Sequence, residues 1–337
     1  MPNASWDALV STTLKNYTPR IEDNLFNNVT LLYWLKEAGN IEKVSGGEQL
    51  VEPLLYGANG TVGSYAGYDN ILTTPQDGIT SAIYDWKQYA VSIAISGLEE
   101  AKNRGESAVM SLLKAKVDQA EMSLMDGMNV MFYGDGTGNN SKNWNGLSNL
   151  IQISGTGDTA VGTGTVGGID SSTDSWWRNQ VKQLSSASVG FKISDLSSIY
   201  NACSNGRIHP DFILTSQKMW ERYESLLQPQ LRYQSTKAAD AGFENLLYKS
   251  APIMWDSAAN TGVHAKRMYF LNSKFLKLKV HSDVWLKNTP FEKPHGQDAR
   301  YSQILCYGNL VTNNRRYLGV LEQTATVAAA TSASQPV

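Results

Sequence analysis

The chain has 337 residues, 42% of them hydrophobic, which is enough to bury one large core with excursions or two ordinary domains. Lysine and arginine total 29 against 31 acidic residues, a formal net charge of -2. Because no overall positive charge is present to neutralise phosphates, this composition excludes a protein that holds nucleic acid over its whole surface. It leaves room for local or non-specific contact with DNA.

The cysteines and the N-terminus indicate the compartment. Cys203 and Cys306 lie far apart and match no metal-ligand spacing. Met1 is followed by polar residues rather than by a basic and then apolar leader. No apolar run approaches the roughly 20 residues needed to cross a bilayer. We therefore expect a protein made and used in a reducing cytoplasm, without a membrane-spanning role.

The first part of the chain predicts an arm followed by a hairpin. Residues 1–43 lack a sustained period, apart from a short helix near residues 25–38, where Leu25, Val29, Leu32 and Leu35 fall near one face. Residues 49–56 are extended, residues 75–78 carry turn residues, and a long return strand follows.

The return strand changes the side on which its apolar residues lie. One side carries Ala82, Tyr84 and Trp86, and the other carries Tyr89, Val91, Ile93 and Ile95. The change near residues 87–88 predicts a bulge or a change in which face is covered. Together these segments predict one long hairpin over residues 44–95.

Two helices are predicted next. Ser96 and Glu99 have the spacing of a capping box, so a helix should begin there. After a break at Gly105, residues 106 to about 133 carry apolar residues at helical spacing. At 1.5 Å per residue, this second helix would be roughly 40 Å long. We interpret its Met-rich stripe as core packing rather than a cofactor site.

The rest of the chain predicts an α+β domain. Residues 134–175 are rich in Gly, Asn, Ser, Thr and Asp, which is typical of long surface loops. Helices are expected at 194–203 and 216–228, and strands at 212–214, 253–255, 268–271 and 276–280, with a final stretch at 301–321. The strands do not alternate regularly with helices, which argues against a doubly wound sheet. The tail, 324–337, should fray.

No motif predicts catalysis, a cofactor or a metal. Residues 162–167 fit the letters G-x-G-x-x-G, but no helical pattern follows, so we interpret them as a flexible loop. Residues 135–139 offer oxygen ligands at alternate positions, yet Gly146 stands where an EF-hand needs Glu, which favours a turn. The four histidines occur singly, and no nucleophile elbow is present.

Aromatic residues on the arm and the hairpin need a surface to pack against. A two-stranded ribbon is marginal on its own in water, and aromatic side chains are enriched at interfaces. We therefore predict that these residues contact other subunits: Trp6, Phe26, Tyr33, Trp34, Tyr56, Tyr65, Tyr68, Tyr84 and Trp86.

The order of arm, long hairpin, long helix and α+β domain resembles the tailed-phage major capsid fold of the Hong Kong phage type. Short stretches in the same order add to the resemblance: Trp176-Trp177-Arg178, residues 208–216, residues 250–256, residues 268–272, Gly308-Asn309-Leu310-Val311 and Asn314-Arg315-Arg316. No single stretch is specific, and the resemblance rests on their order over nearly the whole chain.

The resemblance implies a domain plan: N-terminal arm 1–43, E-loop hairpin 44–95, peripheral domain with the spine helix 96–154, axial domain 155–275, peripheral return strands 276–323 and flexible tail 324–337. It implies a virion protein that forms hexamers and pentamers of an icosahedral shell, is assembled in the host cytoplasm, works with a portal and touches packaged DNA non-specifically.

Two departures from the family pattern refine the expectation. The arm begins almost at Met1, so we expect a separate scaffold protein or none. No lysine occurs from Gln49 through Trp86, so we expect no covalent cross-link through the hairpin, and denaturant alone should release monomers. The alternatives are an encapsulin-like nanocompartment shell and a monomeric binding or adhesion module; an enzyme ranks below both.

Overall fold

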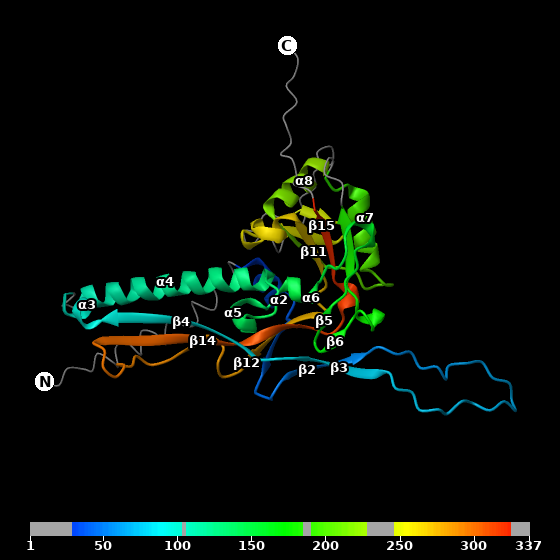
Figure 1. The fold of residues 1–337 in the computed structure, drawn as a ribbon, viewed down its shortest axis with the longest axis horizontal. Helices are drawn as coiled ribbons and strands as arrows, with labels where there is room; N and C mark the ends of the chain where they lie inside the picture. The colour runs from blue at the N-terminus through cyan, green and yellow to red at the C-terminus, as the bar shows by residue number, and fades with distance from the viewer. Residues whose placement is uncertain (1–28, 103–105, 185–189, 228–245, 325–337) are drawn as a thin grey trace, which may run out of the picture.

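The computed structural model describes residues 29–102, 106–184, 190–227 and 246–324, with side chains left out for 100–113. Trp6, Leu25, Phe26 and nearly all of the predicted tail lie outside these ranges. Two main sheets, one long helix and a projecting hairpin make up the fold (Figure 1).

The first main sheet has five strands: β1 (Ile41–Val44), β12 (Leu276–His281), β14 (Ala299–Thr312) and β13 (Lys287–Asn288) in that order, with β4 (Lys87–Ser96) also paired to β14. The short helix α3 (Gly97–Lys102) follows β4, and the long helix α4 (Glu106–Tyr133) runs along β4 and β14 (Figure 1). The face of α4 that carries Val117, Leu124 and Met128 is buried.

One glycine explains how closely α4 approaches the sheet. Glycine inside a helix costs about 1 kcal/mol relative to alanine. A Cβ built on Gly127 would lie 1.9 Å from the hydroxyl oxygen of Tyr89 on β4. The missing side chain at this position therefore leaves space for the Tyr89 ring between helix and strand.

The second main sheet has six strands in the order β7 (Gln180–Leu184), β15 (Gly319–Gln323), β11 (Arg267–Leu271), β8 (Phe212–Thr215), β10 (Ala251–Trp255) and β9 (Leu246–Tyr248). Helices α7 (Ile193–Ala202) and α8 (Gln217–Leu227) lie beside it (Figure 1). Short elements join α4 to β7: α5 (Gly138–Ser141), α6 (Leu147–Leu150), β5 (Thr165–Val166) and β6 (Ile169–Asp170). The 3-10 helix η4 (Gly262–Lys266) precedes β11 of the six-stranded sheet.

The hairpin consists of β2 (Leu50–Leu55) and β3 (Ile79–Tyr84), which form a separate two-stranded sheet. The loop at 56–78 extends away from the body of the molecule (Figure 1). The change of parity predicted near residues 87–88 is the point where the chain leaves this small sheet and enters the five-stranded one.

Most predicted elements are confirmed. The capping box is present, because Ser96 N donates to Glu99 Oε2 at 3.1 Å and Glu99 N donates to Ser96 Oγ at 3.3 Å. The long helix has the predicted bounds, and the helices at 193–202 and 217–227 lie where the pattern placed them. The helix predicted near residues 25–38 is present in the described residues as α2 (Thr30–Glu37). Leu32 and Leu35 within it are buried, as is Val29 just before it.

The sheets divide the chain differently from the expected domain plan. β15 falls within the expected return segment 276–323, yet it pairs with β7 and β11 of the six-stranded sheet. β4 falls within the expected hairpin, yet it pairs with β14. The expected arm ends in α2 and β1, which pack into the body of their own chain. Residues 134–175 are not only surface loop, since Trp144 and Leu147 are buried.

Candidate assembly surface

The two faces of the hairpin differ in what covers them. On the inner face, Leu50, Leu54, Ala82 and Tyr84 are buried and belong to the main core. The outer face carries the cross-strand pairs Val51 with Ile83 and Leu55 with Ile79. These four side chains are exposed by 51%, 42%, 81% and 71% in that order. A strand with one face in water normally alternates apolar and polar residues, so an apolar outer face is typical of an interaction surface.

The loop beyond the strands continues this apolar character. Apart from Tyr56 at its start, its large exposed side chains are Val62, Tyr65, Tyr68, Ile71 and Leu72. The only charged residues among positions 56–78 are Asp69 and Asp77. We name the outer face of β2 and β3 together with these five loop residues the hairpin surface.

The residues predicted from the sequence to contact other subunits fall into four groups, of which the half-buried Tyr33 and Trp86 are one. Tyr65 and Tyr68 are exposed on the hairpin surface. Tyr56 is also exposed but lies outside that surface, and its ring stacks on Trp176 of its own chain at 4.9 Å. Trp34 and Tyr84 are buried within their own chain. Trp6 and Phe26 lie outside the described residues.

Own-chain contacts account for the burial of Trp34 and Tyr84. The Trp34 ring stacks on Phe212 at 4.9 Å, and the Tyr84 hydroxyl donates to Thr312 O at 2.8 Å. Tyr33 and Trp86 are half-buried, and Trp86 Nε1 donates to Gly47 O at 2.9 Å. Trp34 and Tyr84 therefore pack within their own chain and are not part of the hairpin surface.

Sequence reasoning missed the aliphatic residues of the hairpin surface. Residues 50–55, Leu-Val-Glu-Pro-Leu-Leu, are apolar at positions of both parities. A strand of this kind needs cover on both faces. Counting aromatic residues alone does not detect this pattern.

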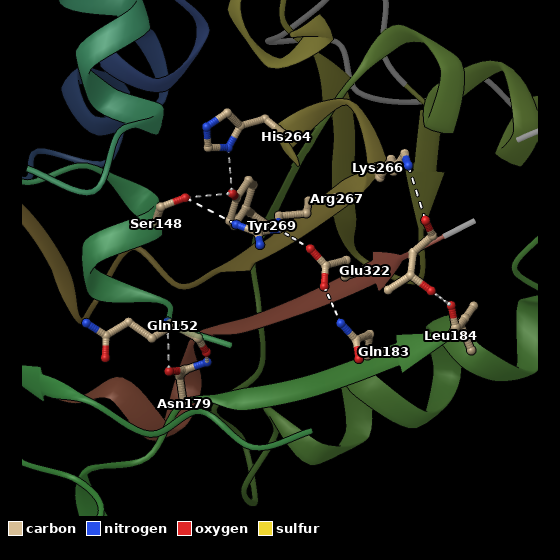
Figure 2. Close-up of polar contacts among 11 residues, drawn as sticks. Ser148, Gln152, Asn179, Gln183, Leu184, His264, Lys266, Arg267, Tyr269 and Glu322 are labelled. Atoms are coloured by element: carbon tan, nitrogen blue, oxygen red, sulfur yellow. Dashed lines mark hydrogen bonds and ion pairs between the residues drawn. The ribbon is translucent and has the colours of Figure 1, made fainter. Parts of the chain in front are cut away.

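A polar cluster joins α6 to the six-stranded sheet (Figure 2). The guanidinium of Arg267 on β11 donates from Nε to Glu322 Oε1 at 2.7 Å, and Gln183 Nε2 donates to Glu322 Oε2 at 2.6 Å. Arg267 Nη1 also donates to Ser148 Oγ at 3.3 Å. The largely buried Arg267–Glu322 ion pair thus joins β11 to β15, and its hydrogen bonds to Gln183 and Ser148 extend the link to β7 and α6.

His264 is the candidate base of this cluster. Its Nδ1 lies 3.0 Å from the hydroxyl oxygen of Tyr269, and the Tyr269 hydroxyl lies 3.4 Å from Ser148 Oγ. Burial, and then the positive charge of Arg267, lower the pKa of His264 below 6.5. Burial raises the pKa of Tyr269 above 10.

This arrangement satisfies polar groups rather than activating a nucleophile. The imidazole contacts the phenol and not the serine, and the carboxylate of Glu322 is engaged by Arg267 and Gln183 instead of orienting the imidazole. Among the residues that the structure describes, no group of three or more His, Cys, Asp or Glu could hold a metal ion. The cluster therefore fastens elements of the fold together.

The two motifs considered in the sequence have structural explanations. Residues 162–167 enter the short strand β5 and its turn, and no helix begins at their glycines. Asp135 Oδ1 accepts hydrogen bonds from Thr137 N at 3.0 Å and Thr137 Oγ1 at 2.8 Å. These hydrogen bonds lower the pKa of Asp135 and form the predicted turn. Within the described ranges, no helix combines the length and apolarity needed to span a membrane.

A projecting hairpin, a long helix along one sheet and a second sheet with flanking helices together define the fold class of the chain. The chain is similar to the capsid of cyanophage A-1(L), with a TM-score of 0.56 and 16% identity over 86% of this chain and 92% of that one. It is similar to the capsid protein of a native GTA particle, with a TM-score of 0.53 and 10% identity over 86% and 90%.

A third similar structure is the holo-SrpI encapsulin complex from Synechococcus elongatus PCC 7942, with a TM-score of 0.55 and 9% identity over 90% of each chain. No protein-family model and no curated protein sequence matches the chain. The chain therefore has the tailed-phage major capsid fold of the Hong Kong phage type, as the sequence predicted.

Proposed function

We propose that this protein is a major capsid protein that assembles into the icosahedral shell enclosing a phage genome. The observation that carries the proposal is the hairpin surface, whose exposed aliphatic and aromatic side chains have no cover in the single described chain. The shared fold supports the same conclusion, because the similar structures are themselves subunits of capsids and of a compartment.

Burial of the hairpin surface gives a favourable free energy for self-association. Each large aliphatic side chain contributes about 1.5–3 kcal/mol when it becomes fully buried. Four such residues lie on β2 and β3, and five further large residues lie on the loop. In a closed symmetric shell each subunit presents this surface once and covers that of a neighbour, so modest contacts sum to a stable particle.

The near-zero net charge of the chain is consistent with a shell that encloses DNA without binding it tightly. With a net charge of -2, an inner wall would touch packaged DNA through local, salt-sensitive and non-specific contacts. Pentamers and hexamers, a portal, a separate scaffold protein and residence in the virion after assembly in the host cytoplasm remain predictions of this proposal.

A nanocompartment shell is the second candidate. The similarity to the encapsulin complex covers as much of the chain as the similarity to the phage capsids does, and it favours the same assembly with a different content. The two candidates differ in what the shell encloses, an enzyme in one case and DNA in the other.

Expression of the full chain, alone and with its neighbouring genes, tests the proposal. Sedimentation and negative-stain microscopy should show closed particles, and particles formed with the neighbouring genes should contain DNA and a portal. Particles that contain a co-packaged enzyme would support the nanocompartment instead. A chain that stays monomeric under every condition, including high concentration, would contradict both shell functions and leave the binding or adhesion module.

A further inference from the structure

The base of the hairpin is attached to the body of the molecule through buried polar contacts. Glu52 on β2 points inward, and its Oε1 lies 2.6 Å from Nζ of Lys279 on β12. Both side chains are buried. Lys279 Nζ also donates to Val51 O at 3.2 Å, so a single ammonium group contacts the carboxylate and the backbone of the same strand.

A second lysine completes the charge arrangement. Lys277 Nζ lies 3.7 Å from Glu52 Oε2 and 3.6 Å from Glu42 Oε2, and its side chain is partly exposed. Glu52 is therefore the one acidic group of β2 and β3, and it lies between two lysines of β12. A buried carboxylate is tolerated only when it is paired, because removal from water costs several kcal/mol per ion.

The second strand of the hairpin is attached separately. The Tyr84 hydroxyl donates to Thr312 O at 2.8 Å, and Asn309 Nδ2 donates to Asp85 O at 2.9 Å, which ties the end of β3 to β14. Ile83 N donates to Gly167 O at 2.9 Å. Gly167 has a φ of +61°, and a Cβ there would lie 2.7 Å from Ala82 Cβ, so the β5–β6 turn is in close contact with β3.

These contacts all join the base of the hairpin to other elements of the same chain. Because they involve β12, β14 and the β5–β6 turn at once, the hairpin base cannot pivot about one strand without breaking a contact to another element. The direction of the hairpin is therefore set by its own subunit.

We propose that Glu52 and Lys279 are positioning residues that fix the direction of the hairpin base in the unassembled subunit, so that the hairpin surface is presented before a neighbour arrives. The use of that surface in a shell rests on the proposed function, whereas the fixed direction does not. The alternative is a hairpin that becomes ordered only when another subunit covers it.

Amide hydrogen exchange on the full-length, unassembled protein at low concentration tests this. In the wild type, residues 50–55 and 79–84 should exchange slowly, as residues 299–308 of β14 do, while residues 57–78 exchange fast. Lys279→Met leaves the Glu52 carboxylate buried without its near partner, so exchange in 50–55 and 79–84 should accelerate about tenfold or more while β14 is unchanged.

Two further variants keep the test decisive if Lys279→Met does not fold. Glu52→Gln keeps the size of the side chain and removes its charge, so it should accelerate exchange in the same two strands by a smaller factor. Lys277→Met is the graded comparison, since this lysine lies farther from Glu52 and is partly exposed, and it should accelerate exchange in the two strands by a smaller factor than Lys279→Met does.

The assembly readout separates positioning from general stability. Glu52→Gln should reduce the yield of closed particles at a temperature where its unfolding curve shows it fully folded. Fast exchange of both hairpin strands in the wild type would overturn the proposal, as would unchanged exchange in Glu52→Gln, or equal acceleration in β14. Because exchange is measured on unassembled chains, a failure to form shells would refute the proposed function and leave this result standing.

Discussion

Arg315 donates a hydrogen bond from Nη2 to Asn179 Oδ1 at 2.8 Å, and its guanidinium is fully buried. Its Nε donates to Leu150 O at 2.9 Å, and its Nη1 lies 3.1 Å from Ser171 Oγ. The partners are neutral, and burial lowers the pKa of Arg315 to about 10. One side chain thus joins the segments around residues 150, 171 and 179, which connect the two main sheets.

Replacement of Arg315 should destabilise the fold strongly. Arg315→Met leaves the Leu150 carbonyl and the Asn179 amide oxygen with fewer donors, and unsatisfied buried polar groups cost about 1–3 kcal/mol each. We expect a loss of about 3 kcal/mol or more in the free energy of unfolding, measured by urea denaturation. Arg316→Met is the matched control, because Arg316 is exposed, and it should change stability by less than about 0.5 kcal/mol. Equal effects of the two substitutions would contradict this role.

His264 should contribute to the loss of stability in acid. Its pKa in the folded protein is lowered below 6.5 by burial and by Arg267, so the unfolded chain binds a proton at higher pH than the folded chain does. The stability it contributes is fully present above about pH 6.5 and is lost as the pH falls through the folded pKa.

Urea denaturation at about pH 7.5 and about pH 5 measures this contribution. His264→Gln should lose less stability between these pH values than the wild type does, while His295→Gln, at an exposed position, should match the wild type. A wild-type pH dependence that persists unchanged in His264→Gln would show that other groups are responsible.

Gly146 should tolerate no side chain. It follows α4 and α5, and a Cβ there would lie 2.5 Å from the carbonyl oxygens of both Gly134 and Met131. Backbone atoms at the end of a helix cannot move aside without breaking its last turn, so Gly146→Ala should cost about 1–3 kcal/mol. Gly67→Ala, with no atom within 4 Å of its Cβ, is the control and should be near neutral. Thermal unfolding of both variants measures the difference in stability. A Gly146→Ala protein as stable as the wild type would contradict this close approach.

The sequence predicted the local elements of secondary structure and missed the pairing of strands that are far apart in the chain. The apolar residues of the 28-residue helix α4 recur at helical spacing, and a glycine precedes the helix in the sequence, so its bounds could be predicted. The pairing of β15 with β7 is set by packing between segments more than a hundred residues apart, and no period in either segment reports it. The expected domain plan therefore differs from the observed sheets at β4 and β15.

The same distinction applies to the candidate surface. A pattern shows which residues share a face, but it does not show whether the partner of that face belongs to the same chain. Tyr84 and Tyr65 are both aromatic residues of the predicted hairpin, yet Tyr84 is held by Thr312 of its own chain, whereas Tyr65 is exposed. The inner face of β2 and β3 can be told from the outer face only when the positions of β12 and β14 are known.

The outer face of the hairpin should be needed for assembly and not for folding. Leu55 and Ile79 oppose each other across β2 and β3 and are highly exposed. Leu55→Asn and Ile79→Asn should each change the free energy of unfolding of the single chain by less than about 0.5 kcal/mol, because most of each side chain is in solvent. Both should raise the protein concentration at which particles form, since the polar amide would be buried in the contact without its own partner.

Met122→Gln on α4 is a matched control, because Met122 is 63% exposed and lies outside the hairpin surface. Sedimentation over a range of concentrations gives the assembly threshold, and circular dichroism confirms that each variant is folded. Shells that form at wild-type concentrations from Leu55→Asn and Ile79→Asn would show that this face stays in solvent. The cover for the hairpin would then have to come from the loop residues 56–78 alone, and substitution of Tyr65 and Tyr68 would become the deciding experiment.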